Sequence, residues 1–244
     1  MKIKNLTDIL FVKNIKCIYC NEELNTDKKY CMCDNCFANL PFNDGKICRI
    51  CGRKIYGDMD ICKECIKDKP NYLVGRSVFI YDGMARSLVS RLKFYHGKYL
   101  GEYLSKFIFD KYLELGWKCD IVLPVPMYKS KLKERGYNQA VELCRSFEGV
   151  IPIRTDILVK IKNTKNQAKS TFEERKVNLL DCFAIENSLD IKGKNILLVD
   201  DVITTGNTLR ECCRMLNKNG VKKIYILTLS SVDVFKDIEK IGYE

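Results

Sequence analysis

The chain has 244 residues, 46% of them hydrophobic, which is enough for one α/β domain with a substantial core and a small additional module. No apolar run reaches about 18 residues, and the first residues lack a secretory signal pattern, so we expect no membrane span and a cytoplasmic location. The net charge of +11 suggests an anionic partner such as nucleic acid or a polyphosphate. A lysine-rich composition that only improves solubility would give the same charge.

The first 66 residues contain nine of the 14 cysteines, and eight of these nine form four Cys-x-x-Cys pairs. Each such turn directs two thiolates at one metal ion, and two turns complete a tetrahedron. Twelve residues separate the first two pairs and ten separate the last two, which is typical of zinc ribbons. We therefore predict two structural zinc ions, one bound by Cys17, Cys20, Cys33 and Cys36 and the other by Cys48, Cys51, Cys62 and Cys65.

Other interpretations of the cysteines are less consistent with their spacing. A crossed arrangement, in which alternate pairs share a metal, stays open. An iron–sulfur cluster usually has a run of closely spaced cysteines, and a redox motif would not recur four times. Cys31 belongs to no pair, so we do not expect it to be a ligand. Such ribbons can also contact nucleic acid or a partner protein.

A polar, proline-containing stretch at residues 65–71 marks the expected boundary between a zinc-ribbon module at 1–68 and a second domain at 72–244. From residue 72 onward, short apolar runs alternate with amphipathic segments, which predicts a parallel or mixed sheet flanked by helices. We expect strands at residues 76–81, 121–125, 150–153, 195–199 and 223–230, and helices at 84–94, 99–115, 131–147 and 209–219.

The expected strand at 121–125 leads into the turn Pro124-Val-Pro126, and four cations follow it within ten residues. A turn just beyond a strand end, followed by cations, is suited to a pyrophosphate, and the planar fork of arginine matches phosphate oxygens. Lys131 and Lys133 are better explained as a solvated start of a helix. The run Arg135-Gly-Tyr-Asn-Gln139 combines a cation, a glycine and two amides, so we favour a ligand-binding role for it.

Residues 160–178 carry six Lys or Arg against two Glu and show no clear periodicity. Two interpretations are open: a mobile lid that closes over a polyphosphate and excludes water, or a disordered surface loop.

The most informative segment is residues 196–208, Ile-Leu-Leu-Val-Asp-Asp-Val-Ile-Thr-Thr-Gly-Asn-Thr. Its apolar start predicts a buried parallel strand, and ligands of such sheets bind beyond the carboxyl ends of the strands. Asp200 and Asp201 follow as two acceptors for paired hydroxyls. A threonine and glycine loop then leads into a helix whose N-terminus favours an anion. A plain strand–turn–helix connection is the alternative, but the whole string at this spacing favours a phosphate site.

This segment resembles the phosphoribosyl pyrophosphate (PRPP) motif of the type I phosphoribosyltransferases. The resemblance implies that fold, namely a parallel sheet flanked by helices, here preceded by the Cys-rich ribbon module. It assigns the ribose hydroxyls to Asp200 and Asp201 and implies magnesium bound together with PRPP. It assigns the 5′-phosphate to the loop formed by Thr204, Thr205, Gly206, Asn207 and Thr208.

Pro124-Val-Pro126 with Arg135-Gly-Tyr-Asn-Gln139, behind four Cys-x-x-Cys pairs, is similar to the ComF family, whose members act in DNA uptake. Tyr137 stands where that family often has Phe, and Lys93-Phe94 resembles a family feature. The resemblance makes Arg135 a PRPP contact, and it makes Lys165 and Lys169 candidate basic contacts to the leaving group. Four residues of the basic segment match a family pattern: Thr164, Gln167, Arg175 and Asn178.

Three functions fit these observations. The first is a phosphoribosyl transfer to an acceptor that the sequence does not identify. The second is a binding protein for natural transformation, in which the PRPP pocket is a sensor or a relic. Its basic surface would hold single-stranded DNA, and it would work with a DNA-uptake helicase or processing proteins. The third is a regulator that senses PRPP or another nucleotide ligand, which alters its contacts with DNA or protein. The intact carboxylate pair and loop are better support for binding than for transfer.

Overall fold

The computed structural model describes residues 15–24, 28–94, 97–163 and 181–233. Four parallel strands form its main sheet, in the order β1-β6-β5-β2. Their bounds are β1 Val74–Ile80, β2 Ile121–Pro124, β5 Asn195–Ile203 and β6 Lys223–Ser231. The carboxyl ends of these strands therefore meet along one edge, which is where such sheets bind ligands.

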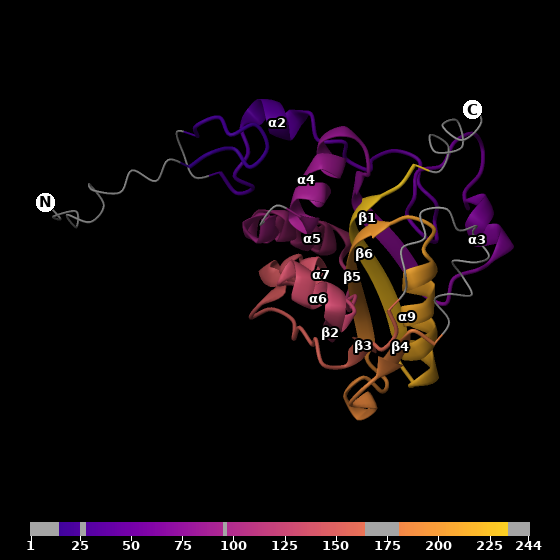
Figure 1. Cartoon of the computed structure of the whole chain (residues 1–244). Coiled ribbons are helices and arrows are strands. Elements are labelled where there is room, and N and C mark those ends of the chain that lie inside the picture. Colours follow the sequence, from indigo (N-terminus) through magenta and orange to yellow (C-terminus); the bar gives the residue numbers. More distant parts are fainter. Residues whose placement is uncertain (1–14, 25–27, 95–96, 164–180, 234–244) are drawn as a thin grey trace, which may run out of the picture.

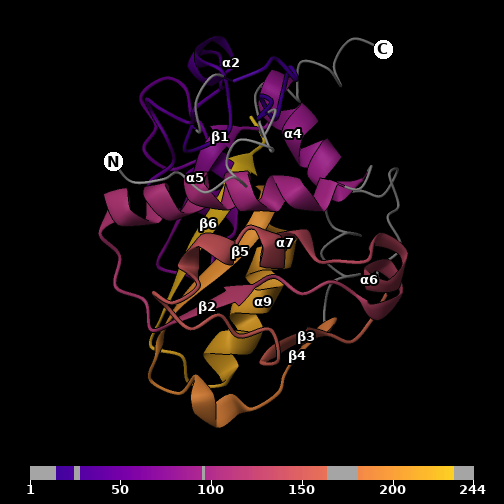
Figure 2. The same ribbon diagram turned by 90° about the vertical axis from the view of Figure 1, so that its left-hand side faces the viewer.

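Helices cover both faces of this sheet (Figures 1 and 2). Alternate residues of β5 enter different cores: Leu197 packs in one core with α4 (Gly83–Lys93) and α5 (Leu100–Leu115), and Leu198 packs in the other with α9 (Asn207–Lys218). This alternation explains the continuous apolar run, because a strand buried on both faces has no polar side. The type I phosphoribosyltransferase fold expected from the sequence is confirmed in this parallel, helix-flanked sheet.

A two-stranded antiparallel sheet lies beside the core that contains α9, and the sequence analysis did not predict it. It pairs β3 (Leu158–Lys160) with β4 (Phe183–Ile185). Each strand has only three residues, which is too short for a recognisable period. Three 3₁₀ turns complete the body, at Gly97–Tyr99, Arg145–Phe147 and Ser188–Asp190.

Two of the predicted elements were wrong. The helix expected at 131–147 is divided into α6 (Lys129–Arg135) and α7 (Gln139–Glu142). Gly136 ends α6 in a left-handed conformation, with φ of +82°, and the Asn138 side chain caps α7. The strand expected at 150–153 is reduced to a single bridge between Val122 and Ile153.

The N-terminal module consists of two ribbons, the first built around the cysteines from Cys17 to Cys36 and the second around those from Cys48 to Cys65. The two ribbons lie on different sides of the sheet (Figure 1). The first contains α2 (Asp34–Ala38), lies beside α4, and packs Cys17, Cys33 and Cys36 in the core of α4 and α5. The second contains α3 (Lys63–Lys67) and packs in the core of α9. Each ribbon is therefore continuous with a different hydrophobic layer.

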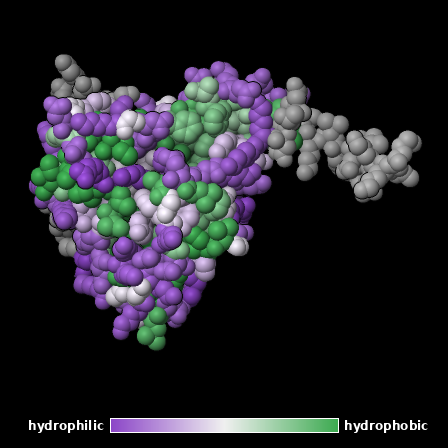
Figure 3. All heavy atoms as spheres, turned by 180° about the vertical axis from the view of Figure 1, so that it is seen from behind, coloured by the Kyte–Doolittle hydropathy of each residue, from purple (hydrophilic) through white to green (hydrophobic). Residues whose placement is uncertain are grey.

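The back of the molecule carries several separate apolar patches among hydrophilic side chains (Figure 3). Of the helices in the described part of the chain, none combines the length and apolar character needed to cross a bilayer.

Candidate functional site

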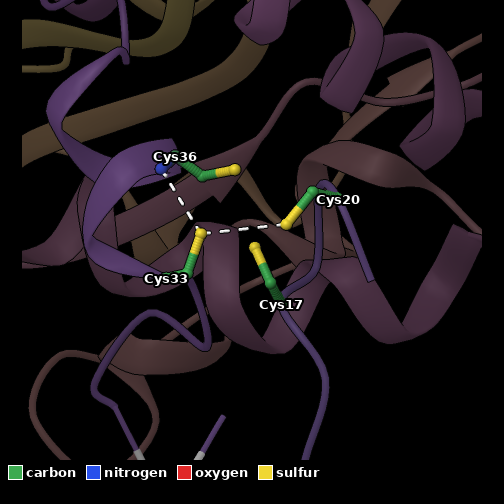
Figure 4. A group of neighbouring side chains, drawn as sticks. All are labelled: Cys17, Cys20, Cys33 and Cys36. Carbon is green, nitrogen blue, oxygen red and sulfur yellow. Dashed lines mark hydrogen bonds between the residues drawn. The ribbon is translucent and has the colours of Figure 1, made fainter. Parts of the chain in front are cut away.

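The eight paired cysteines form two compact groups of four. Within each group all sulfur atoms lie within 4.8 Å of one another. In the first group the four side chains point toward a common centre (Figure 4). The groups are those expected from consecutive pairing: Cys17, Cys20, Cys33 and Cys36, and Cys48, Cys51, Cys62 and Cys65. The crossed arrangement is thereby rejected.

The geometry of both groups fits zinc. Tetrahedral Zn–S bonds of about 2.3 Å place neighbouring sulfurs about 3.8 Å apart. The Sγ atoms of Cys20 and Cys33 are 3.7 Å apart, and those of Cys51 and Cys62 are 3.6 Å apart. Backbone N–H groups also donate to the sulfurs, from Cys36 to Cys33 at 3.4 Å and from Cys62 to Cys48 at 3.3 Å. Such hydrogen bonds stabilise thiolate charge, so both sites are consistent with structural zinc.

Cys31 belongs to neither group. It is buried, and its thiol donates to the carbonyl of Lys16 at 3.2 Å. It therefore packs and hydrogen-bonds within the first ribbon, a role that the sequence analysis did not assign.

Asp200 and Asp201 lie within β5, which continues to Ile203 instead of ending at Val199 as expected. Pairing with β6 causes the extension, since Asp200 faces Thr228 and Val202 faces Ser230 in the register. Successive side chains of a strand point to opposite faces, so the two carboxylates diverge from the backbone. Asp201 is 4% exposed.

Lys93, at the end of α4, neutralises Asp201. Its Nζ lies 2.9 Å from Oδ2 of Asp201. Burial by itself would lower the pKa of Lys93, but the nearby Asp201 and Asp200 raise it above its usual value. The lysine therefore stays charged. The sequence analysis noted only that Lys93-Phe94 resembles a feature of the ComF family. The structure adds that Lys93 is the ion-pair partner of Asp201.

The pKa of Asp200 is raised to about 8, first by burial and then by the charge of Asp201. Lys93 and Lys160 oppose this shift without cancelling it. A carboxyl group with such a pKa gains from any additional cation or hydrogen-bond donor. The charged form of Asp200 therefore lacks sufficient stabilisation from the protein, and a ligand that supplies a cation or hydrogen-bond donors would provide it.

The loop at residues 204–208 connects β5 to α9. Gly206 has φ of +79°, a conformation that a residue with a side chain rarely adopts, and it stands directly before the helix. The Thr205 hydroxyl accepts from the N–H of Asn207 at 3.5 Å. Asn207 is 5% exposed, and neither polar atom of its side chain has a hydrogen-bond partner among the described residues. The helix has 12 residues, so its N-terminus favours an anion at this loop.

The Arg135 guanidinium lies over the Phe94 ring, 5.4 Å from its centre, and donates to Oε1 of Gln139 at 2.5 Å. The Tyr137 hydroxyl donates to the carbonyl of Leu92. These contacts attach α6 and α7 to the end of α4 that carries Lys93. They do not join Arg135 to the carboxylates or to the loop, so a direct contact of Arg135 with PRPP stays a prediction.

A cavity of about 470 Å³ opens beside the carboxyl end of β2. Pro124, Pro126, Met127 and Tyr137 line it, together with Lys160 of β3. Burial lowers the pKa of Lys160, and its charge also acts on Asp200. The sequence gave no reason to separate Lys160 from the other lysines of its basic segment. The predicted contacts Lys165 and Lys169, and the pattern residues Thr164, Gln167, Arg175 and Asn178, lie outside the described residues.

Comparison with known proteins agrees with this geometry. Residues 98–234, more than half of the chain, match the phosphoribosyl transferase domain family, and residues 6–66 match the double zinc ribbon domain. Competence protein F of Haemophilus influenzae is 28% identical over 231 residues, covering 89% of this chain and 97% of that protein. Competence protein ComFC of Bacillus subtilis is 29% identical over 203 residues, covering 81% of each chain. The chain belongs to the ComF family.

Other members of the family are similarly distant. DNA utilization protein YhgH of Escherichia coli K12 is 25% identical over 219 residues, covering 81% of this chain and 96% of that protein. Relatives of this kind match the chain along most of their own length. The ComF resemblance drawn from the motifs is therefore confirmed, and it includes both the ribbons and the phosphoribosyltransferase domain.

Proposed function

We propose that the carboxyl end of β5 binds PRPP, with Asp200 and Asp201 accepting hydrogen bonds from the ribose hydroxyls. The loop at residues 204–208 would bind the 5′-phosphate. The observation that carries this proposal is the pair of a buried Asp201 and a half-buried Asp200, whose pKa is about 8, a few residues before a glycine-led helix N-terminus. Hydroxyl donors would stabilise the charged form of Asp200, and the helix start and its N–H groups would stabilise a phosphate.

Magnesium fits the same edge. This ion is usually bound by one or two carboxylates together with substrate phosphates, and Asp200 offers a carboxylate that lacks a neutralising partner as close as that of Asp201. Bound with PRPP, magnesium would neutralise pyrophosphate charge. The ion pair with Lys93 orients the Asp201 side chain toward the end of α4.

Calorimetry with Mg-PRPP tests the proposal directly. The double variant Asp200→Asn/Asp201→Asn should lose binding, with the affinity falling on the order of 100-fold or more, because charged acceptors become neutral amides. Asp156→Asn is a matched control, since Asp156 is a surface carboxylate that pairs with Arg154. Equal affinity in the wild-type protein and the double variant would reject the site.

We further propose that the protein acts in DNA uptake. The support is the names of its relatives, which describe competence proteins and DNA utilization proteins. A transformation assay in cells carrying Asp200→Asn/Asp201→Asn should show a large loss of transformants. Normal transformation, combined with lost Mg-PRPP binding, would show that the pocket does not serve this role.

Phosphoribosyl transfer is compatible with the site but requires an acceptor. The cavity beside β2 gives a space of about 470 Å³, lined by Tyr137 and Met127, for a planar or apolar acceptor group. Screening nucleobases and amines for pyrophosphate release from Mg-PRPP would detect transfer. Release that is independent of every acceptor and equal to the spontaneous rate would favour a binding or sensing role.

Single-stranded DNA is a second candidate ligand, favoured by the net charge of +11. Binding through lysine and arginine contacts to phosphates releases counterions, so the affinity should fall steeply with added salt. A titration of a labelled oligonucleotide between about 50 and 200 mM salt measures that slope. An affinity that does not change with salt would contradict a charge-based DNA surface.

A further inference from the structure

Arg53 of the second ribbon is a buried arginine, 2% exposed, that connects the metal site to the phosphate loop. Its Nε donates to the sulfur of Cys51 at 3.3 Å, and one terminal nitrogen donates to the sulfur of Cys62 at 3.7 Å. The other terminal nitrogen donates to the backbone carbonyl of Thr204 at 3.0 Å. One planar group therefore contacts two predicted zinc ligands and the first residue of the loop.

The charge of Arg53 is compatible with burial only if anions lie close to it. A zinc ion with four thiolates keeps excess negative charge, and the sulfurs of Cys51 and Cys62 present it directly to the guanidinium. Glu64 adds a carboxylate oxygen at 3.7 Å. The guanidinium is therefore fixed in place by the cluster, with the Thr204 carbonyl as its neutral acceptor.

Holding the Thr204 carbonyl also fixes the direction of the next amide. A trans peptide unit is planar, and its C=O and N–H groups point in opposite directions. Because the carbonyl of Thr204 points at the second ribbon, the N–H of Thr205 points away from that ribbon. Arg53 thereby sets the orientation of a backbone donor in the loop that we assign to the phosphate.

Further contacts hold the second ribbon against α9, β1 and the segment that follows β6. Arg210, in the first turn of α9, donates to the carbonyl of Asp68 at 2.5 Å. The Tyr56 hydroxyl donates to Asp233, just after β6, at 2.5 Å. Gly52 approaches Gly75 so closely that a Cβ atom at Gly52 would lie 2.5 Å from the Gly75 oxygen. The second ribbon is thus fitted tightly to the sheet edge beside the loop.

We propose that Arg53 is a positioning residue that couples zinc binding at the second cysteine group to phosphate binding at residues 204–208. This inference rests on the proposed PRPP function of the loop. The thiolates of Cys51 and Cys62, which a bound zinc ion would hold in place, fix Arg53. Arg53 holds the Thr204–Thr205 peptide in the orientation that would receive a phosphate.

The variant Arg53→Lys tests the coupling in the full-length protein. Lysine keeps the charge but lacks the planar fork, so it cannot contact both sulfurs and the carbonyl together. Arg91→Lys is the matched control, because Arg91 donates to a backbone carbonyl of the first ribbon, that of Ile18, at 2.6 Å. Three quantities are measured for each variant: zinc per chain, amide hydrogen exchange of residues 205–208, and Mg-PRPP affinity by calorimetry.

For Arg53→Lys we expect two zinc ions per chain, exchange in the loop at least tenfold faster, and an affinity at least tenfold weaker. Arg91→Lys should change neither the exchange nor the affinity. Wild-type exchange and affinity in an Arg53→Lys protein with both zinc ions would overturn the proposal.

If Arg53→Lys loses zinc or does not fold, a second pair of variants tests whether the second cysteine group is coupled to the loop. Cys62→Ser removes a ligand of the second group, and Cys20→Ser removes one of the first. The coupling predicts faster loop exchange in Cys62→Ser alone, and equal effects of the two variants would overturn it. Hydrogen exchange in the loop is measured without ligand, so it tests the role of Arg53 independently of PRPP. Failure of the wild-type protein to bind Mg-PRPP would refute the proposed function alone.

Discussion

The two zinc ribbons have the same four ligands and nearly the same spacing, yet they contact different parts of the molecule. The first is bound to helices: Tyr30 stacks on Phe107 of α5, with ring centres 3.9 Å apart, and its hydroxyl donates to Asp110. The second contacts the loop after β5 through Arg53. Two cysteine groups of the same kind therefore have different neighbours: the first ribbon packs on the helical core, and the second contacts the loop that we propose binds a phosphate.

Their cysteines also differ in exposure. Cys20 of the first group is exposed, whereas all four cysteines of the second group are buried. A chelator reaches an exposed thiolate more easily than a buried one. The first ribbon is thus the accessible metal site, and the second is the protected site next to the loop.

The largest effect should come from removing zinc. We expect two zinc ions per chain by metal analysis, released by a chelator in two phases, with the first ribbon losing its ion before the second. Structural zinc contributes about 10–16 kcal/mol of binding free energy in small ribbons, so each loss should unfold its ribbon. Mg-PRPP binding should survive the first phase and disappear in the second. Fewer than two zinc ions, or binding lost in the first phase, would remove the distinction between the ribbons.

Neutralising Asp201 tests whether the carboxyl end of β5 is a ligand edge at all. Asp201→Asn leaves Lys93 without its ion-pair partner, so the free energy of unfolding should fall by about 1–3 kcal/mol. The Mg-PRPP affinity should fall on the order of 100-fold. Denaturant unfolding and calorimetry measure the two effects. An unchanged affinity would mean that the ribose does not contact this carboxylate.

Asp200→Asn should lower the affinity but increase stability, in contrast to Asp201→Asn. The folded pKa of Asp200, about 8, lies above its ordinary value of 3.8, so protonation favours the folded state. Its contribution to stability is fully present below about pH 4 and is lost as the pH rises through about 8. At pH 9 the variant should therefore be more stable than the wild-type protein by about 1–3 kcal/mol, with little difference at acidic pH.

The same pKa predicts that Mg-PRPP binding at pH 7 releases up to about one proton, because the ligand site uses the charged carboxylate. Calorimetry in buffers with different ionisation enthalpies measures this release. Asp200→Asn should remove it, and proton release that persists in the variant would assign it to another group.

The smallest effect should come from the docking of the first ribbon. Tyr30→Phe keeps the stacking on Phe107 but loses the hydrogen bond to Asp110, which should cost about 1 kcal/mol of stability. The Mg-PRPP affinity should not change. A weaker affinity in Tyr30→Phe would show that the first ribbon also acts on the ligand edge, and the contrast between the ribbons would fail.

The sequence predicted the cysteine groups and the central strand well. It failed on one helix and on the pairing of two short strands. The metal groups were predictable because each Cys-x-x-Cys pair is a local turn, and β5 was recognisable from its apolar run. The helix expected at 131–147 failed because Gly136 and Asn138 interrupt it with local caps. The pairing of β3 with β4 was missed because each strand has only three residues and the two strands lie far apart in the sequence. The boundary between the ribbon module and the domain at 72–244 stays a prediction.

By itself, the sequence singled out the eight cysteines that gather in two groups suited to a metal ion, and it predicted ligand-binding roles for the Asp200–Asp201 pair and the loop around Gly206. These follow from residue type and short spacing, which local geometry fixes. Only the tertiary structure brought Lys93 to Asp201, Lys160 near Asp200, and Arg53 to Thr204, over 151 residues of chain. Those contacts depend on how helices and ribbons pack on the sheet, and the partner of a buried charge is set by packing across the whole fold.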